Sequence, residues 1–443
     1  MELLALSPGS FQWLFPRNPK RGTDPQIRKK RCSGWRIQVS IADSGESGQK
    51  HTKIVTFLGK GGSGRTTASV LAAKLYAKEG LQTCLVIHSQ DIITVEQLMG
   101  CTIGDFPTMI SENLFAVQLR TSKMLLEPLD RMKKVDARMN LTQGILEGVV
   151  GEELGVLPGM DSIFSFLALQ KYGNLFSRGR DYSKKEFDIV IYDGSSSEDT
   201  LRLVGATERV RWYLKYVRNI AEKTDIGRLT APSFLRLVYE SAAINPGSVE
   251  GKTSTAIWNE IEQILEEASA YFRDCSRFRC YLLMDPSRPL SVISALRYWG
   301  CAIQAGTNIY GAFGFALKFS SATQETVERM SPLSFTLLPF ISSYSSLDWD
   351  EILNSFSKDA SNLLLGNTIS LHSLVLFDHK QKSVTLFLPG FNKSEIKLYQ
   401  YRGGAELLVE AGDQRRIIQL PPGMQGKVAG AKFIKRSLVV TLR

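Results

Sequence analysis

Apolar and polar positions divide the chain into a part where strands alternate with helices and a closing part of short strands only. Residues 53–58, 83–87 and 187–193 are runs of mostly apolar side chains rich in β-branched and aromatic residues, as in strands buried on both faces of a sheet. Residues 68–80 have apolar positions at helical spacing and a glycine stop. Residues 283–318 repeat the order strand, helix, strand. This alternation predicts an α/β domain with a mostly parallel sheet.

The pattern changes after about residue 366, where seven short runs alternate apolar and polar residues. Gly, Pro, Asn or Asp mark most of their boundaries. The runs are residues 373–378, 383–389, 395–401, 405–411, 415–421, 427–434 and 437–442. Seven short antiparallel-type strands predict a β-sandwich domain over residues 371–443.

The first 50 residues show no hydrophobic periodicity and are rich in Pro, Gly, Ser and Arg. They hold nine basic and four acidic side chains, so this tail supplies +5 of the net charge of +10. Because half of the charge excess lies in this tail, it does not form a basic stripe on the surface of the folded part. We therefore expect no nucleic-acid partner for the folded part. The composition is typical of an organelle transit peptide removed from the mature protein. A disordered basic arm that contacts RNA or a membrane is the alternative.

Cysteine spacing and hydropathy exclude three further classes. The six cysteines form no CxxC pair, which argues against a disulfide framework and against a four-thiolate zinc site. No run of about 18 apolar residues is present, so no ordinary transmembrane helix is expected.

A glycine-rich loop joins the first predicted strand to the first predicted helix. It consists of Gly59, Lys60, Gly61, Gly62, Ser63, Gly64, Arg65, Thr66 and Thr67. Residues without a Cβ let backbone N–H groups close around a phosphate, and the following helix N-terminus adds partial positive charge. The Thr66 hydroxyl stands where such loops bind Mg²⁺, and Arg65 replaces the usual lysine. The loop predicts a phosphate site for ATP with Mg²⁺.

The pattern KGGxG[KR]TT, with Lys60 early in the loop, resembles the arsenite-pump ATPase family, which includes targeting factors for tail-anchored membrane proteins. The resemblance spans about residues 53–345 of a predicted domain over 51–365. It implies a P-loop NTPase fold and a homodimer in which Lys60 reaches the partner's nucleotide. It also implies hydrophobic membrane-protein segments as clients, with transient membrane association.

Two further segments carry the resemblance. Asp193 ends the strand 187–193, where a nucleotide-binding sheet places an acid that orients Mg²⁺ and water. Thr200, Leu201 and Arg202 follow as in the family's second switch, although Asp199 replaces its histidine. Asn308 matches the family's adenine-reading asparagine, so the resemblance implies a base contact there.

The first switch diverges from the family. An ungapped match puts Gln90 where the family has its water-activating aspartate, and Asp91 follows one residue later. A carboxylate can act as a base, whereas an amide only orients water. Either Asp91 takes the catalytic position or the protein hydrolyses ATP slowly; the sequence leaves both open.

Two stretches are candidates for a client groove. Residues 120–180 are rich in methionine and leucine, and residues 205–272 are amphipathic and helical. Methionine side chains adapt to varied apolar partners. By resemblance, these stretches form a helical client-binding subdomain; ordinary helical core is the alternative.

The closing domain contains Leu388-Pro389-Gly390-Phe391, Lys393 and Glu395, and resembles an α-crystallin or small heat-shock protein domain. Either it binds through its sheet edges, or it only stabilises the dimer. An ATPase domain joined to such a domain resembles the plant and cyanobacterial branch of the family. Together with the basic tail, this branch indicates the chloroplast stroma.

Three functions follow as expectations. The first is an ATP-dependent dimeric targeting factor or chaperone that releases its client on hydrolysis. The second is a scaffold or holdase that binds ATP and hydrolyses it weakly, suggested by Gln90 and Arg65. The third is a positioning or metallocluster-carrier ATPase, which the missing cysteine pairs disfavour. The sequence identifies neither the client nor the transit-peptide cleavage site.

Overall fold

The computed structural model describes residues 52–88, 91–120, 187–207, 254–316, 320–341, 347–366 and 375–443, with Ser165, Leu169, Arg218 and Lys223 as single positions. The basic tail, Gln90 and the client-groove stretch 120–180, apart from Arg120, Ser165 and Leu169, lie outside the described residues, as does much of 205–253. Within the described residues, no helix is both long and apolar enough to cross a membrane. Residues 50–443 form one compact unit.

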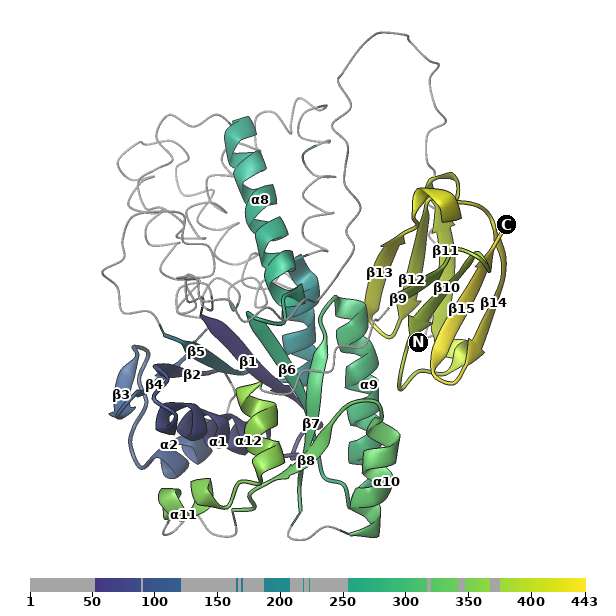
Figure 1. Cartoon of the computed structure of the whole chain (residues 1–443). Helices are drawn as coiled ribbons and strands as arrows, with labels where there is room; N and C mark the ends of the chain where they lie inside the picture. The colour runs from purple at the N-terminus through teal and green to yellow at the C-terminus, as the bar shows by residue number, and fades with distance from the viewer. Residues whose placement is uncertain are drawn as a thin grey trace, which may run out of the picture. The chain divides into compact units, whose positions relative to one another are not determined.

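An eight-stranded sheet forms the centre of the first domain (Figure 1). Its order is β3-β4-β2-β5-β1-β6-β7-β8, and every neighbouring pair is parallel except β3–β4. The strands are β1 Lys53–Leu58, β2 Thr83–Ile87, β3 Thr108–Ser111, β4 Leu114–Gln118, β5 Ile189–Asp193, β6 Phe278–Met284, β7 Ile309–Phe315 and β8 Phe335–Leu338. The predicted mostly parallel α/β sheet is confirmed.

Helices cover both faces of this sheet, and its central strands are therefore buried on both sides. They are α1 Arg65–Lys78, α2 Ile92–Met99, α8 Ser254–Arg273, α9 Pro289–Ala305, α10 Ser321–Met330, α11 Trp349–Asn354 and α12 Lys358–Leu365. One core packs α1, α2 and α12 against the sheet, and the other packs α8, α9 and α10, as Figure 1 shows. On each face, apolar surface removed from water stabilises the fold by about 25 cal/mol per Å².

The strand order determines which loops meet. β1 lies between β5 and β6, so the loop after β1 lies beside the ends of both neighbours. In open α/β sheets, ligands bind at the carboxyl ends of the strands. Both Gly59 and Asp193 lie at this edge.

The closing domain contains a four-stranded sheet of order β14-β15-β10-β9 and a three-stranded sheet of order β11-β12-β13. All pairs are antiparallel. The strands are β9 Val375–Asp378, β10 Ser383–Phe387, β11 Ile396–Tyr401, β12 Glu406–Ala411, β13 Gln414–Gln419, β14 Val428–Ile434 and β15 Ser437–Leu442. Val384, Leu407 and Val440 belong to one buried core shared by both sheets. The predicted antiparallel β domain and its seven strands are thus observed.

Candidate functional site

The glycine loop leaves β1 and enters α1, and its residues Lys60, Gly61 and Gly62 are exposed. Gly62 and Gly64 have φ of 78° and 89°, a left-handed conformation that glycine adopts without a steric cost. A Cβ at Gly61 or Gly62 would meet nothing within 4 Å, whereas one at Gly64 would lie 2.6 Å from the Phe315 ring. The loop therefore has open space on one side and close packing on the other.

The Ser63 side chain faces inward in this loop. Its Oγ is buried and has no hydrogen-bond partner within the described part of the chain. Gly64 is the N-cap of α1 and makes no side-chain cap, so the first amides of the helix are available to an anion. A hollow of about 400 Å³ lies between residues 60–63 and residues 285–291. These features fit a bound phosphate chain.

A hydroxyl and a carboxylate meet beside the loop. Thr66 Oγ1 donates to Asp193 Oδ2 at 3.0 Å, and Asp193 is 3% exposed. Hard oxygen ligands of this kind suit Mg²⁺. The structure thus brings together the two residues that the sequence proposed as metal ligands.

Arg65 contacts the turn after β5, a role that its position in the loop does not predict. Its Nη1 and Nη2 donate to the carbonyls of Gly194 and Ser195, both at 3.2 Å. The planar guanidinium group of Arg65 therefore joins the start of α1 to the turn after β5. A lysine has no planar fork and cannot make this pair of contacts in the same way.

Ser197 fastens the same turn to the loop. Its Oγ accepts from the Gly59 amide at 2.9 Å and donates to the Gly59 carbonyl at 2.8 Å. No local pattern indicates this role, because serine is an ordinary residue in a polar turn. The turn over residues 194–199 is thus held to the glycine loop at two points, by Arg65 and by Ser197.

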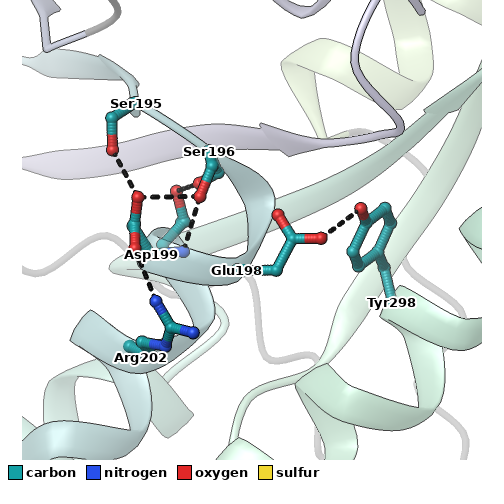
Figure 2. A network of polar contacts seen from close by, with 7 residues as sticks. Ser195, Ser196, Glu198, Asp199, Arg202 and Tyr298 are labelled. Atoms are coloured by element: carbon teal, nitrogen blue, oxygen red, sulfur yellow. Dashed lines mark hydrogen bonds and ion pairs between the residues drawn. The ribbon is translucent and has the colours of Figure 1, made fainter. Parts of the chain in front are cut away.

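Asp199 organises the turn from within, as Figure 2 shows. Its Oδ2 accepts from the hydroxyls of Ser195 and Ser196 at 2.9 and 2.8 Å, and its Oδ1 pairs with Arg202 Nη1 at 3.0 Å. Partial burial alone would raise the pKa of Asp199. The hydrogen bonds from Ser196 and Ser195 and the charge of Arg202 outweigh it and lower that pKa.

We expect Asp199→Asn to destabilise the protein in a pH-dependent way. A carboxyl group with a lowered folded-state pKa contributes stability above its ordinary pKa of about 3.9, and the contribution is lost as pH falls through the folded-state value. The side chain is 45% exposed, so the loss stays below about 1 kcal/mol. Urea unfolding of both proteins between pH 7 and pH 3 should show the difference shrinking below about pH 4. A difference that grows toward pH 3 would contradict this assignment.

Asp91 is the N-cap of α2. Its Oδ1 accepts from the Thr94 amide at 3.3 Å, and the residue is exposed. This bond uses the carboxylate that the sequence proposed as a catalytic base. The question of Asp91 or Gln90 therefore remains where the sequence left it, since Gln90 lies outside the described residues.

Asn308 is at the wrong edge of the sheet for the role proposed from sequence. It precedes β7, which runs parallel to β6 and, through β6, to β1. Gly59 follows the carboxyl end of β1, so Asn308 lies at the opposite end of the parallel strands. Its side chain neighbours Tyr310 instead. This position does not support a contact between Asn308 and an adenine base bound at the loop.

The chain matches two described families in the same order as its domains. Residues 52–283 match the family described as "Anion-transporting ATPase". Residues 379–442 match "HSP20-like domain found in ArsA". The second match confirms the resemblance to a small heat-shock domain.

Individual relatives are consistent with these matches. An arsenical pump-driving ATPase, so named, of Chlorobaculum tepidum is 30% identical over 412 residues, which are 86% of this chain and 94% of its own. One of that name in Prosthecochloris vibrioformis is 30% identical over 168 residues, 38% of this chain and 39% of the relative. The protein named ATPase GET3 of Lachancea thermotolerans is 25% identical over 170 residues, 37% and 47% of the two chains. The chain thus spans less than half of the last two relatives.

The matched family covers more than half of the chain, and the glycine loop, Thr66 and Asp193 lie within the matched residues. The chain therefore belongs to the anion-transporting ATPase (ArsA) family and carries at its carboxyl end the HSP20-like domain found in members of that family.

Proposed function

We propose that this protein is a dimeric, ATP-dependent targeting factor or chaperone for hydrophobic membrane-protein segments. The observation that carries the proposal is the pair Thr66 and Asp193, 3.0 Å apart beside the glycine loop. Amides of residues 61–65 would hold the phosphates, and Thr66 with Asp193 would hold Mg²⁺. When bound, Mg²⁺ would neutralise charge that develops on the phosphate oxygens. Asp193 would also orient water on that ion.

The dimer is part of this proposal because the resemblance of the KGGxG[KR]TT loop to the arsenite-pump ATPase family implies that Lys60 reaches the partner's nucleotide. Lys60 is exposed at the tip of the loop, beside the hollow lined by residues 285–291. An exposed ammonium that acts on a partner's nucleotide would make the site complete only in the dimer. Each subunit would then need its partner for hydrolysis.

We expect Lys60→Ala to lower ATP hydrolysis at least about tenfold through loss of one charge contact to the phosphates. Mixing this variant with Asp193→Asn gives the sharper test. Half of the dimers are then mixed, and each mixed dimer has one site with both residues intact. The mixture should regain about a quarter of the wild-type rate. A mixture no faster than its two components would rule out action across an interface.

Weak hydrolysis is the second candidate, and two contacts favour it. Arg65 donates to the carbonyls of Gly194 and Ser195, and Asp91 caps α2. Both charged groups are thus occupied within the chain. Single-turnover hydrolysis separates the candidates: a wild-type rate equal to that of Lys60→Ala identifies a nucleotide-gated scaffold.

The client is proposed from family membership, since most residues of the proposed groove are not described. A relative named ATPase GET3 matches part of the chain. The test is binding of a labelled apolar helix of about 20 residues, the length that spans a bilayer. Binding should depend on nucleotide. A scrambled polar peptide that binds equally well would overturn the client assignment.

The chloroplast stroma is proposed from the basic, acid-poor tail over residues 1–50. A fluorescent protein fused after residue 50 should enter isolated chloroplasts and lose the tail. Full-length fusion protein left outside the organelle, and accessible to added protease, would contradict this location.

A further inference from the structure

Helix α9 contacts the turn over residues 194–199 from one side. The Tyr298 hydroxyl donates to Glu198 Oε1 at 2.6 Å, and Figure 2 shows the two side chains pointing toward each other. Partial burial and the neighbouring Glu198 carboxylate raise the pKa of Tyr298, so the hydroxyl stays protonated and keeps donating. Glu198 is one residue from Ser197 and one from Asp199, which are the anchors of the turn. Tyr298 thus holds the turn near its carboxyl end.

The neighbouring residue of α9 contacts the HSP20-like domain. Arg297 Nη1 pairs with Glu395 Oε1 at 2.6 Å, and the guanidinium lies 4.1 Å from the centre of the Phe391 ring. The amide of Asn392 and the charge of Arg297 lower the pKa of Glu395, although partial burial opposes them. Both side chains are about one-third exposed. Such a cation held by a carboxylate and a ring fixes the position of α9 more firmly than either contact alone.

Close packing leaves α9 little freedom against that domain. A Cβ at Gly300 would lie 2.2 Å from the Pro389 carbonyl oxygen and 2.6 Å from the Phe391 ring. The Trp299 and Phe387 rings meet edge to face with centres 5.1 Å apart. A shift of the domain must therefore move α9, because densely packed groups transmit displacement.

The start of α9 also lies at the nucleotide site. Residues 285–291 and the loop residues 60–63 line the same hollow. The Asp285 amide donates to Ser291 Oγ at 3.0 Å, which ties the first turn of the helix to the end of β6. One helix therefore joins the hollow, the turn and the HSP20-like domain.

We propose that α9 couples the HSP20-like domain to nucleotide turnover, with Tyr298 as the positioning residue that holds the turn through Glu198. The inference rests on the proposed ATPase function for its kinetic part. Occupation of the HSP20-like domain by a partner would shift Arg297 and Tyr298 together, and the turn would follow. The glycine loop would feel this shift through its bonds to the turn at Gly59 and Arg65.

Two variants and a control test the coupling by kinetics. Tyr298→Phe and Arg297→Gln should each lower kcat about five- to tenfold and change KM for ATP less than about twofold, since both act on the loop only through the turn. The double variant should be no slower than the slower single one, because both act through α9. Arg436→Gln is the control: it removes a 2.7 Å contact from the same domain to the Arg329 carbonyl on α10. It should leave kcat unchanged.

A second readout needs no hydrolysis. Hydrogen exchange of the amides of residues 197–203, measured without nucleotide on the full chain, should be faster in Tyr298→Phe and in Arg297→Gln, but not in Arg436→Gln. Unchanged exchange in Arg297→Gln would overturn the coupling. A wild-type chain that hydrolyses no ATP would instead overturn the proposed function, and exchange would still decide the coupling. Exchanging the charges with Arg297→Glu and Glu395→Arg together should restore slow exchange relative to Arg297→Glu alone.

Discussion

Asp193→Asn is expected to lower ATP hydrolysis by about 100-fold or more, the size of effect seen when one preorganised electrostatic group is removed from an active site. The carboxylate is buried and already accepts from Thr66 Oγ1 at 3.0 Å. An amide of the same shape keeps the packing and loses the negative charge that Mg²⁺ needs. Steady-state phosphate release with saturating Mg-ATP measures the effect.

The matched control is Asp188→Asn, close to the other end of the same strand. Asp188 Oδ2 accepts from the Gln82 amide at 2.9 Å, at the amino edge of the sheet. The same chemical change there should leave the hydrolysis rate within about twofold of the wild type, because the charge lies away from the loop. Hydrolysis by Asp193→Asn at the wild-type rate would refute the assignment of Asp193.

Gly64→Ala is expected to destabilise the protein by about 2–5 kcal/mol and to weaken ATP binding. A left-handed φ costs a residue with a Cβ about 1–2 kcal/mol. The new Cβ would also lie 2.6 Å from the Phe315 ring, and such overpacking costs about 1–3 kcal/mol. Relief of the clash would displace α1, whose N-cap is Gly64. Urea unfolding gives the free energy, and ATP titration gives the affinity.

Gly62→Ala separates the two causes. Gly62 has a similar φ of 78°, but its Cβ would meet nothing within 4 Å. This variant should lose only the backbone part, about 1–2 kcal/mol. If Gly62→Ala and Gly64→Ala are equally destabilised, contact with Phe315 plays no part.

Much of the fold could be predicted because its signals are local. Glycine spacing between a buried strand and a helix specified the loop, and alternation located all seven strands of the closing domain within a few residues. The strands β3, β4 and β8 were not identified. All three are only four or five residues long, and β3 and β8 are only partly buried. Their apolar pattern in the sequence is therefore weak.

The functional site was only partly predictable because its contacts join distant residues. Arg65 and Gly194 are 129 positions apart, and Glu198 and Tyr298 are 100 apart. No periodicity encodes such pairs. Asn308 is different: it stands directly before a predicted strand, and a residue that precedes a parallel strand lies at the amino edge of the sheet. Applied strictly, that rule would have removed Asn308 from the nucleotide site.

Equilibrium dialysis of the full chain against labelled ATP with Mg²⁺ measures the central assignment most directly, namely that the loop from Gly59 to Thr67 holds a nucleotide. We expect saturable binding that approaches one ATP per chain and that is weakened in Gly64→Ala. No retention of ATP by the wild-type chain at millimolar nucleotide would contradict the account.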